Sequence, residues 1–322
     1  MTIHALVARE ESVAFEALDA LPPGEVTVDV AYSSLNYKDA LAVTRRGKIV
    51  RRFPMVLGID LAGVVADSQH ADFATGTNVL AVGQGLGESE WGGYAQRQSV
   101  RADALLPLPS GLSTEQAMQL GTAGFTAMLC VMALERNNVV PDSREVVVTG
   151  AAGGVGSIAV LLLAKLGYRV AASTGRSELA DYLHTLGAQT IVTRDELANP
   201  GAPMQKERWS GGIDTVGGTT LANVFAQTAY GGAVACCGMA GGNELATTVW
   251  PLILRNVSLL GVSSIRTPKA ERAEAWTRLA SDIDLAKLAE LSRTEPLSRI
   301  FELSEEILAG RVRGRIAIDV NR

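Results

Sequence analysis

A strand, a turn of small residues and a helix follow one another between positions 146 and 166, and this succession constrains the fold of the chain most strongly. The strand is the apolar run Val146–Val148. Ala151, Gly153 and Gly156 then occupy the small positions of a G-x-G-x-x-G-like loop, with alanine at the first. Apolar residues repeat at helical spacing after the loop, at Val155, Ile158, Ala159, Leu162, Leu163 and Leu166.

This loop has the properties of a dinucleotide site. A side chain at Gly153 would hold a pyrophosphate away from the backbone, and one at Gly156 would push the helix off the strand. The free N–H groups of the helix N-terminus also attract phosphate. We therefore expect the cofactor to contact Ala152, Gly153, Gly154, Val155 and Gly156. A tight structural turn is the alternative interpretation.

The second strand, Arg169–Ser173, indicates which nucleotide would bind. NAD-binding domains usually carry Asp or Glu at this strand end to hold the ribose 2′-hydroxyl. Here the strand runs into Thr174, Gly175 and Arg176, without an acid. Because a guanidinium suits a 2′-phosphate, the pattern favours NADPH over NADH, with Arg194 as a second possible clamp. Alternatively, Arg176 is a solvated residue that opens the next helix.

The 322 residues favour two domains. Strand and helix patterns alternate from about Ser113, where Ser113 and Gln116 form a capping-box pattern, to about Ser264. That alternation predicts a doubly wound α/β domain with a parallel sheet over residues 113–265. Residues 1–112 read as short strands and turns punctuated by Gly and Pro. A helix over Ala270–Leu279 and a strand over Arg315–Val320 are expected near the end.

Composition excludes several classes of protein. The chain has 29 basic and 34 acidic residues, a net charge of −5, which argues against a general nucleic-acid binder. Its three cysteines form no disulfide framework, which suits a reducing compartment. We find no signal peptide and no apolar run of about 18–20 residues, the longest candidate being Val155–Leu166. We expect a cytoplasmic protein without a membrane partner.

Several motifs resemble a known family over nearly the whole chain. Ser33–Ala40, Phe53–Gly63, Trp91–Ala95 and Gly121–Ala127 are similar to quinone-oxidoreductase-like members of the medium-chain dehydrogenase/reductase superfamily. Asn36–Leu41, Arg51–Pro54, Gly121–Glu135 and Tyr230–Gly232 particularly resemble its NADPH-dependent acryloyl-CoA reductase branch. The resemblance implies a GroES-like catalytic domain from residues 1–112 and 266–322, a Rossmann domain over 113–265, and a homodimer.

One departure from the wider superfamily concerns zinc. Zinc-dependent members carry a cysteine near Tyr37 or Lys38 and a Gly-His-Glu at the segment that is Gly58-Ile59-Asp60 here. The three histidines are scattered, and no tetrahedral ligand set is visible. We expect no metal. Without a Lewis acid, hydride addition to an already polarised C=C bond is favoured over alcohol dehydrogenation.

The segment Asn36–Asp39 supplies the candidate catalytic residues. Asn36 and Asp39 fit a capping box, which is the simpler interpretation of both. The resemblance places Tyr37 at the cleft, where its phenol could contact nicotinamide or donate to a developing enolate. Asn36 is the second catalytic candidate. Lys38 fits a surface charge.

The remaining candidates lie in loops. A basic run comprises Arg45, Arg46, Lys48, Arg51 and Arg52. It is either a solvated loop or a partner for coenzyme A phosphates, with Arg51 and Arg52 as the predicted substrate contacts. The family places Thr126 against the cofactor, and the loops holding Met239 and Ser264 follow Rossmann strands and should face nicotinamide. Cys236 and Cys237 fit small core residues better than nucleophiles.

The leading hypothesis is reduction by NADPH of a short 2-enoyl-CoA, acryloyl-CoA to propanoyl-CoA. Hydride goes to the β-carbon, oriented donors stabilise the enolate oxygen, and Tyr37 or water supplies the α-proton. One alternative is an NADPH:quinone or general enone reductase, which has no use for the basic run. Another is a non-catalytic NADPH-binding protein.

Overall fold

The computed structural model describes residues 2–141 and 144–322, which form two compact units. Unit 1 comprises Met1–Phe125, Ser264–Ala280 and Leu288–Arg322. Unit 2 comprises Thr126–Ser263 and Ser281–Lys287. The predicted boundary after residue 112 lies at the start of helix α2 (Thr114–Arg136), whereas the units divide inside this helix, shortly after Gly121 interrupts it.

Unit 2 is built on a six-stranded parallel sheet with the order β11-β10-β9-β12-β13-β14. This is the doubly wound order of dinucleotide-binding domains, so the predicted Rossmann fold is confirmed. Its strands are β9 (Glu145–Thr149), β10 (Arg169–Thr174), β11 (Thr190–Thr193), β12 (Trp209–Asp214), β13 (Thr228–Cys236) and β14 (Ser258–Gly261). Its helices are α3 (Gly154–Lys165), α4 (Ala180–Leu186) after the 3₁₀ turn η1 (Ser177–Leu179), α5 (Arg194–Ala198), α6 (Gly218–Gln227) and α7 (Trp250–Arg255).

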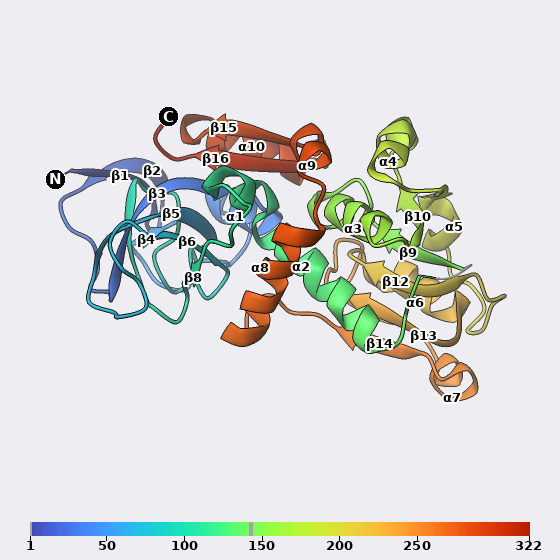
Figure 1. Cartoon of the computed structure of the whole chain (residues 1–322). Helices are drawn as coiled ribbons and strands as arrows, with labels where there is room; N and C mark the ends of the chain where they lie inside the picture. The colour runs from blue at the N-terminus through green and yellow to red at the C-terminus, as the bar shows by residue number, and fades with distance from the viewer. Residues whose placement is uncertain (1, 142–143) are drawn as a thin grey trace. The chain divides into compact units, whose positions relative to one another are not determined.

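Burial on both faces explains the apolar strands of this sheet. Val147 of β9, Ala171 of β10 and Val234 of β13 belong to one buried cluster with Phe225 of α6. Helix α3 lies beside β9 and β10 (Figure 1), and every residue from Gly156 to Leu163 is buried. The crossover strand–helix–strand connections of a parallel sheet require this covering.

Unit 1 holds two further sheets. The first, β2-β1-β4, joins β1 (Ile3–Ala8), β2 (Val13–Leu18) and β4 (Met55–Val56). The second has the order β15-β16-β3-β5-β6-β8, with β7 also paired to β3. Its strands are β3 (Val26–Ser34), β5 (Asp60–Ser68), β6 (Asn78–Val82), β7 (Arg97–Val100), β8 (Leu106–Pro107), β15 (Ser292–Pro296) and β16 (Arg315–Asp319). The remaining helices are α1 (Tyr37–Val43), α8 (Lys269–Asp282), α9 (Leu285–Leu291), the 3₁₀ turn η2 (Leu297–Arg299) and α10 (Ile300–Leu308).

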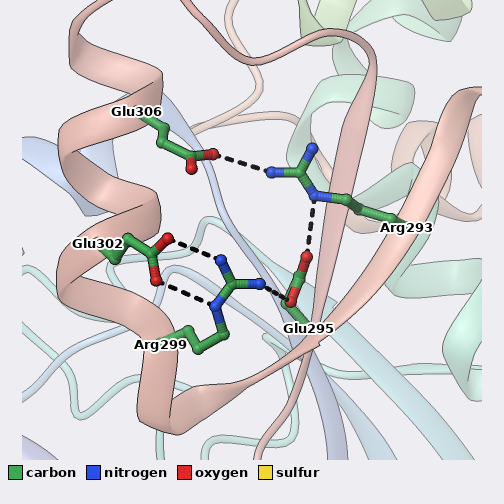
Figure 2. A network of polar contacts seen from close by, with 5 residues as sticks. All are labelled: Arg293, Glu295, Arg299, Glu302 and Glu306. Carbon is green, nitrogen blue, oxygen red and sulfur yellow. Dashed lines mark hydrogen bonds and ion pairs between the residues drawn. The ribbon is translucent and has the colours of Figure 1, made fainter.

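The end of the chain completes the N-terminal sheet. Strand β16 pairs antiparallel with β3, Ala317 lying opposite Ser34, and β15 extends the sheet beside β16. Five charged side chains then join β15 and η2 to α10 (Figure 2): Arg293, Glu295, Arg299, Glu302 and Glu306. The Arg299 guanidinium lowers the pKa of Glu302. Both chain ends therefore build one unit, as the resemblance implied.

Helix α2 corrects one expectation. Its start is as predicted, because Ser113 accepts from the Gln116 N–H at 3.1 Å and Gln116 accepts from the Ser113 N–H at 2.9 Å. However, Val155–Leu166 is not the longest apolar segment. By length and composition α2 could cross a membrane, with a mean hydropathy of 1.6 over 18 residues, of which 83% is buried. A search for unbroken apolar runs misses α2 because Thr122 and Thr126 interrupt its apolar pattern. The burial of α2 indicates that it is a core helix.

Candidate functional site

The glycine loop of unit 2 joins β9 to α3, and its two later glycines differ in role. A Cβ on Gly156 would lie 2.3 Å from the Gly150 oxygen and 2.7 Å from the Ala151 Cα, so this glycine allows the helix to pack on the loop. A Cβ on Gly153 would meet only the Gly150 oxygen, at 3.2 Å. Gly153 therefore leaves open space above the loop, where a ligand can approach the backbone.

The first turn of α3 supplies the donors. Gly153 is the N-cap and has no side chain to bond the first-turn N–H groups, which include those of Gly154, Val155 and Gly156. These groups have no acceptor within the helix. Together with the positive end of a twelve-residue helix, they form an arrangement suited to phosphate oxygens.

The two predicted arginines meet at the end of β10. The Arg176 guanidinium donates from Nη2 to the Ala152 oxygen at 3.1 Å, so it reaches back to the glycine loop. The Arg176 N–H bonds the Thr174 hydroxyl at 3.1 Å. Arg194, the first residue of α5, lies against Gly175: a Cβ on Gly175 would be 2.3 Å from its Cζ. The segment Thr174–Arg176 thus has two positive side chains, its own Arg176 and the neighbouring Arg194, and it contains no acid.

Asp214, which the sequence analysis did not single out, fixes the edge of the sheet beside the glycine loop. Its carboxylate accepts from the Thr149 hydroxyl at 2.6 Å and from the Gly217 N–H at 2.7 Å. The Thr215 hydroxyl in turn donates to the Thr149 oxygen at 2.9 Å. Burial raises the pKa of Asp214. The sequence does contain a signal for Asp214, because it is an acid at the carboxyl end of a buried strand.

The other predicted cofactor contacts are dispersed. Met239 is 71% exposed in the loop after β13, which packs on the loop after β12 through the Gly241 N–H and the Val216 oxygen at 2.7 Å. Thr126 is buried in α2, and Ser264 is half-buried at the point where the chain re-enters unit 1. Burial raises the pKa of Cys236, which keeps it a thiol and a poor nucleophile.

In unit 1 the two predicted catalytic residues lie at the start of α1 and differ in their exposure to solvent. Tyr37, the first helical residue, is 58% exposed, whereas Asn36 is buried. The predicted capping box is present, with the Asn36 N–H bonded to Asp39 Oδ2 at 2.9 Å. The capping box therefore fixes the backbone at Tyr37, while its phenol stays accessible to solvent.

A buried polar network includes Asn36, the residue before this phenol. The Asn36 amide donates to Ser34 Oγ and to Asp60 Oδ2, each at 2.9 Å. Asp60 also accepts from the Thr122 N–H at 2.8 Å. Arg315, on β16, donates from Nε to the Gln119 oxygen at 2.9 Å and from Nη1 to Asn36 Oδ1 at 3.3 Å. The network joins the end of β3, the start of β5, the break in α2 and β16.

The network places two carboxylates and one guanidinium out of water. Burial and the neighbouring Asp60 raise the pKa of Asp39 to about 7. Burial lowers the pKa of Arg315, and the charges of Asp60 and Asp39 oppose that shift. Asp39 therefore titrates near neutral pH, where most carboxyls are fully ionised.

Gly121 allows this network to close. Its φ of 53° lies in the left-handed region, and a Cβ would come within 2.7 Å of Ser34 Oγ and 2.8 Å of Asp60 Oδ2 and Arg315 Nη2. Any larger residue would strain the backbone and displace buried polar atoms.

The basic run separates into different roles. The Arg45 guanidinium donates to the carbonyl oxygens of Glu10 and Glu11, and Arg46 pairs with Glu305 at 2.7 Å. These two arginines therefore serve contacts within unit 1.

The predicted substrate contacts, Arg51 and Arg52, each lie near a glutamate of the loop that follows β6. Arg51 is 3.9 Å from Glu88, which also pairs with Lys38 at 2.8 Å. Lys38 is thus in a partly buried ion pair rather than a free surface charge. Arg52 is 3.4 Å from Glu90 and lines a pocket of about 340 Å³.

The residues of unit 1 do not fit a zinc site. Across residues 2–141 and 144–322, no group of three or more His, Cys, Asp and Glu side chains is placed to hold a metal ion. Asp60 instead accepts hydrogen bonds from Ser34, Asn36 and Thr122. Whether the protein needs a metal stays a prediction.

Two family models match the chain. The model of the alcohol dehydrogenase GroES-like domain matches residues 22–110, and the model of the zinc-binding dehydrogenase matches residues 154–281. The first lies in unit 1, and the second covers most of unit 2.

Similar proteins extend the match to nearly the full length. The chain is 52% identical to the probable acrylyl-CoA reductase AcuI of Escherichia coli K12 over 94% of its length and 93% of the relative's. It is 45% identical to the putative quinone oxidoreductase YhfP of Bacillus subtilis over 92% of its length and 91% of the relative's. The crystal structure of YHDH from E. coli K-12 with bound NADPH superposes with a TM-score of 0.94 at 49% identity, covering 99% of both chains. The chain therefore belongs to the quinone-oxidoreductase-like family of medium-chain dehydrogenases/reductases.

Proposed function

We propose that the protein is an NADPH-dependent reductase that converts acryloyl-CoA to propanoyl-CoA. The observation that carries the proposal is the 52% identity to a probable acrylyl-CoA reductase over 94% of the chain. The match covers 94% of the chain, so it extends over both units.

The residues of unit 2 fit NADPH. The first-turn N–H groups of α3 would hold the pyrophosphate, with Ala152 and Gly153 allowing its close approach. Arg176 and Arg194, beside Thr174 and Gly175, would bind the 2′-phosphate that distinguishes NADPH from NADH. Thr126, Met239 and Ser264 remain proposed contacts further along the cofactor. Bound NADPH supplies the hydride.

The chemistry in unit 1 centres on Tyr37. A polarised enoyl thioester needs donors for the oxygen that becomes negative as hydride adds to the β-carbon. The exposed Tyr37 phenol is such a donor, and either it or water would then protonate the α-carbon. Asn36 would act through position, because its amide is engaged in the buried network below.

Turnover with a substrate panel tests the proposal. With NADPH, the purified protein should reduce acryloyl-CoA with a much higher kcat/KM than a small neutral enone or a benzoquinone. The YhfP relative, named a putative quinone oxidoreductase, supports the quinone alternative. Faster reduction of the quinone would favour that alternative, and absence of turnover with every substrate would favour a non-catalytic NADPH-binding protein.

The proposal extends to the oligomeric state, the compartment and the domain boundaries of the enzyme. We propose a metal-independent, cytoplasmic homodimer, from the resemblance and from three free cysteines, which suit a reducing compartment. We also propose residues 1–112 with 266–322 as the catalytic domain and 113–265 as the NADPH-binding domain. Sedimentation of the native protein would test its oligomeric state.

A further inference from the structure

The pocket beside Arg52 lies wholly within unit 1 and has the composition of a nucleotide site. Four segments line it: the β2–β3 loop with Pro22 and Pro23, the α1–β4 loop with Arg52, the β6–β7 loop with Glu90 and Trp91, and Arg101 after β7. Its volume of about 340 Å³ is at the lower end of the roughly 300–1,000 Å³ range of small-molecule sites. It has room for one end of a long ligand.

Two guanidinium groups lie at this pocket in weak ion pairs. Arg52 is 3.4 Å from Glu90, with side chains 60% and 44% exposed. Arg101 is 3.1 Å from Asp103, with side chains 48% and 68% exposed. Pairs this exposed contribute little to stability, so an arriving anion can replace the carboxylates at small cost. A phosphate offers each guanidinium a stronger, charge-assisted contact.

Three ring side chains also line this pocket. Pro22, Pro23 and Trp91 provide rings, and the Trp91 indole is fixed because its N–H bonds the Pro54 oxygen at 3.2 Å. Rings of this kind suit the faces of a purine. Phosphate-binding cations beside an apolar, ring-lined wall indicate a phosphorylated purine nucleoside rather than a bare anion.

The pocket wall is rigid and tied to the helix that carries Tyr37. Within the β6–β7 loop, the N–H groups of Glu88, Ser89 and Glu90 all bond the Gly85 oxygen, at 2.9–3.0 Å. The buried Glu88 then pairs with Lys38, the residue after Tyr37, at 2.8 Å. The pocket and the proposed catalytic phenol thus share one framework inside unit 1.

We propose that this pocket receives the 3′-phosphoadenosine end of the coenzyme A thioester, with Arg52 and Arg101 as its phosphate contacts. The inference rests on the proposed function, and it revises the predicted contact pair, because Arg101 replaces Arg51. Arg51 instead interacts with Glu88, 3.9 Å away. Glu90 opposes binding, because its carboxylate competes with the phosphate for Arg52.

The test compares acryloyl-CoA with acryloyl-pantetheine, which lacks the nucleotide. In Arg52→Gln and Arg101→Gln, kcat/KM for the CoA ester should fall on the order of ten- to a hundredfold, the range for a lost charge-assisted contact. The pantetheine ester should lose less than about twofold. Glu90→Gln should lower the KM for the CoA ester alone, which no loss of structure would produce. Arg9→Gln is the matched control, because Arg9 is 54% exposed and paired with Glu16 at 2.7 Å outside the pocket.

Adenosine 3′,5′-bisphosphate separates this inference from the proposed function. It should bind the wild-type protein, compete with acryloyl-CoA and bind more weakly to Arg52→Gln. Competition with NADPH alone, or equal losses for both thioesters, would overturn the pocket assignment and leave the reductase proposal standing. If wild-type protein fails to reduce acryloyl-CoA, the function is wrong, and calorimetric titration of the bisphosphate into wild type and Arg52→Gln still decides the pocket.

Discussion

Arg176 determines, on our interpretation, whether the enzyme distinguishes NADPH from NADH. Its Nη2 reaches the Ala152 oxygen at 3.1 Å, so the positive charge lies between the glycine loop and the end of β10. A charge-assisted hydrogen bond to the 2′-phosphate contributes about 1.5–3 kcal/mol. Since Arg176 is only half-buried, we expect the lower end, so Arg176→Ala should reduce kcat/KM for NADPH by about tenfold. NADH lacks the phosphate and should be almost unaffected.

Gly175 gives an independent measure of the Arg194 contribution. A Cβ on Gly175 would lie 2.3–2.5 Å from three atoms of the Arg194 guanidinium group, so Gly175→Ala must displace that flexible side chain. Gly175 has no left-handed φ, and the backbone itself tolerates alanine. Gly175→Ala should therefore weaken NADPH use about as much as Arg194→Ala, by about 1–2 kcal/mol, and the double variant should be no worse than Arg194→Ala.

Steady-state kcat/KM for NADPH and NADH, at a saturating second substrate, provides the assay. Arg144→Ala is the control, because Arg144 precedes β9 at the amino end of the sheet and pairs with Glu207 at 3.4 Å. Equal use of NADPH and NADH by the native enzyme would refute the reasoning. So would an additive double variant, since additivity would mean that alanine at position 175 acts on something other than Arg194.

Four further outcomes are expected. Gly121→Ala should lower the free energy of unfolding by about 2–4 kcal/mol in denaturant titrations, whereas Gly261→Ala, with open space around its Cβ, should cost less than about 1 kcal/mol. Asp39 has its pKa raised to about 7 in the folded state, so the folded protein binds the extra proton and stability should fall as pH rises from about 4 to 7, by an amount on the order of 4 kcal/mol. Asp39→Asn should flatten that slope whatever its absolute stability, and an unchanged slope would assign the pH dependence elsewhere. Tyr37→Phe should reduce kcat more than it raises KM, by about 10²-fold if the phenol transfers the proton. Activity should survive exhaustive chelation, and loss with EDTA that zinc restores would contradict metal independence.

The sequence predicts unit 2 well because its signals are local. Each buried strand is a short apolar run, the longer crossover helices have periodic stripes, and alternation of the two implies a parallel sheet. The apolar pattern of β13 covers only its end, Ala233–Cys236, whereas the strand begins earlier, at Thr228. The extra residues contain Tyr230 and two glycines, which obscure the strand pattern. The short helices α5 and α7 were missed because five or six residues hold too few turns to show a period.

The sequence predicts those parts of the candidate site whose residues lie in one short segment. It does not predict the parts whose interacting side chains are far apart in the sequence. Thr174, Gly175 and Arg176 follow one another at the end of β10, so the sequence alone shows both the arginine and the lack of an acid among these three residues. The basic run, by contrast, looks uniform in sequence, yet its members meet Glu305, Glu88 and Glu90, and only tertiary structure assigns these partners. Arg101 was not singled out because it joins the pocket from the far end of β7.

The buried network explains how unit 1 can position the proposed catalytic phenol, Tyr37, through its own side chains. Asp60 occupies the end of the segment that resembles the Gly-His-Glu of zinc-dependent relatives, but here its oxygens accept from the Thr122 N–H, from Asn36 and from Ser34. Asp39 completes the framework by accepting from the Ile59 N–H at 2.9 Å, which ties α1 to the strand-entry segment. The two anchored residues, Asn36 and Asp39, lie one residue before and two residues after Tyr37. The backbone of Tyr37 is therefore held in place, and substrate binding would restrict only the rotamers of its side chain. Substitutions in this network should therefore change kcat through the placement of Tyr37, because none of the network side chains needs to touch the reacting atoms.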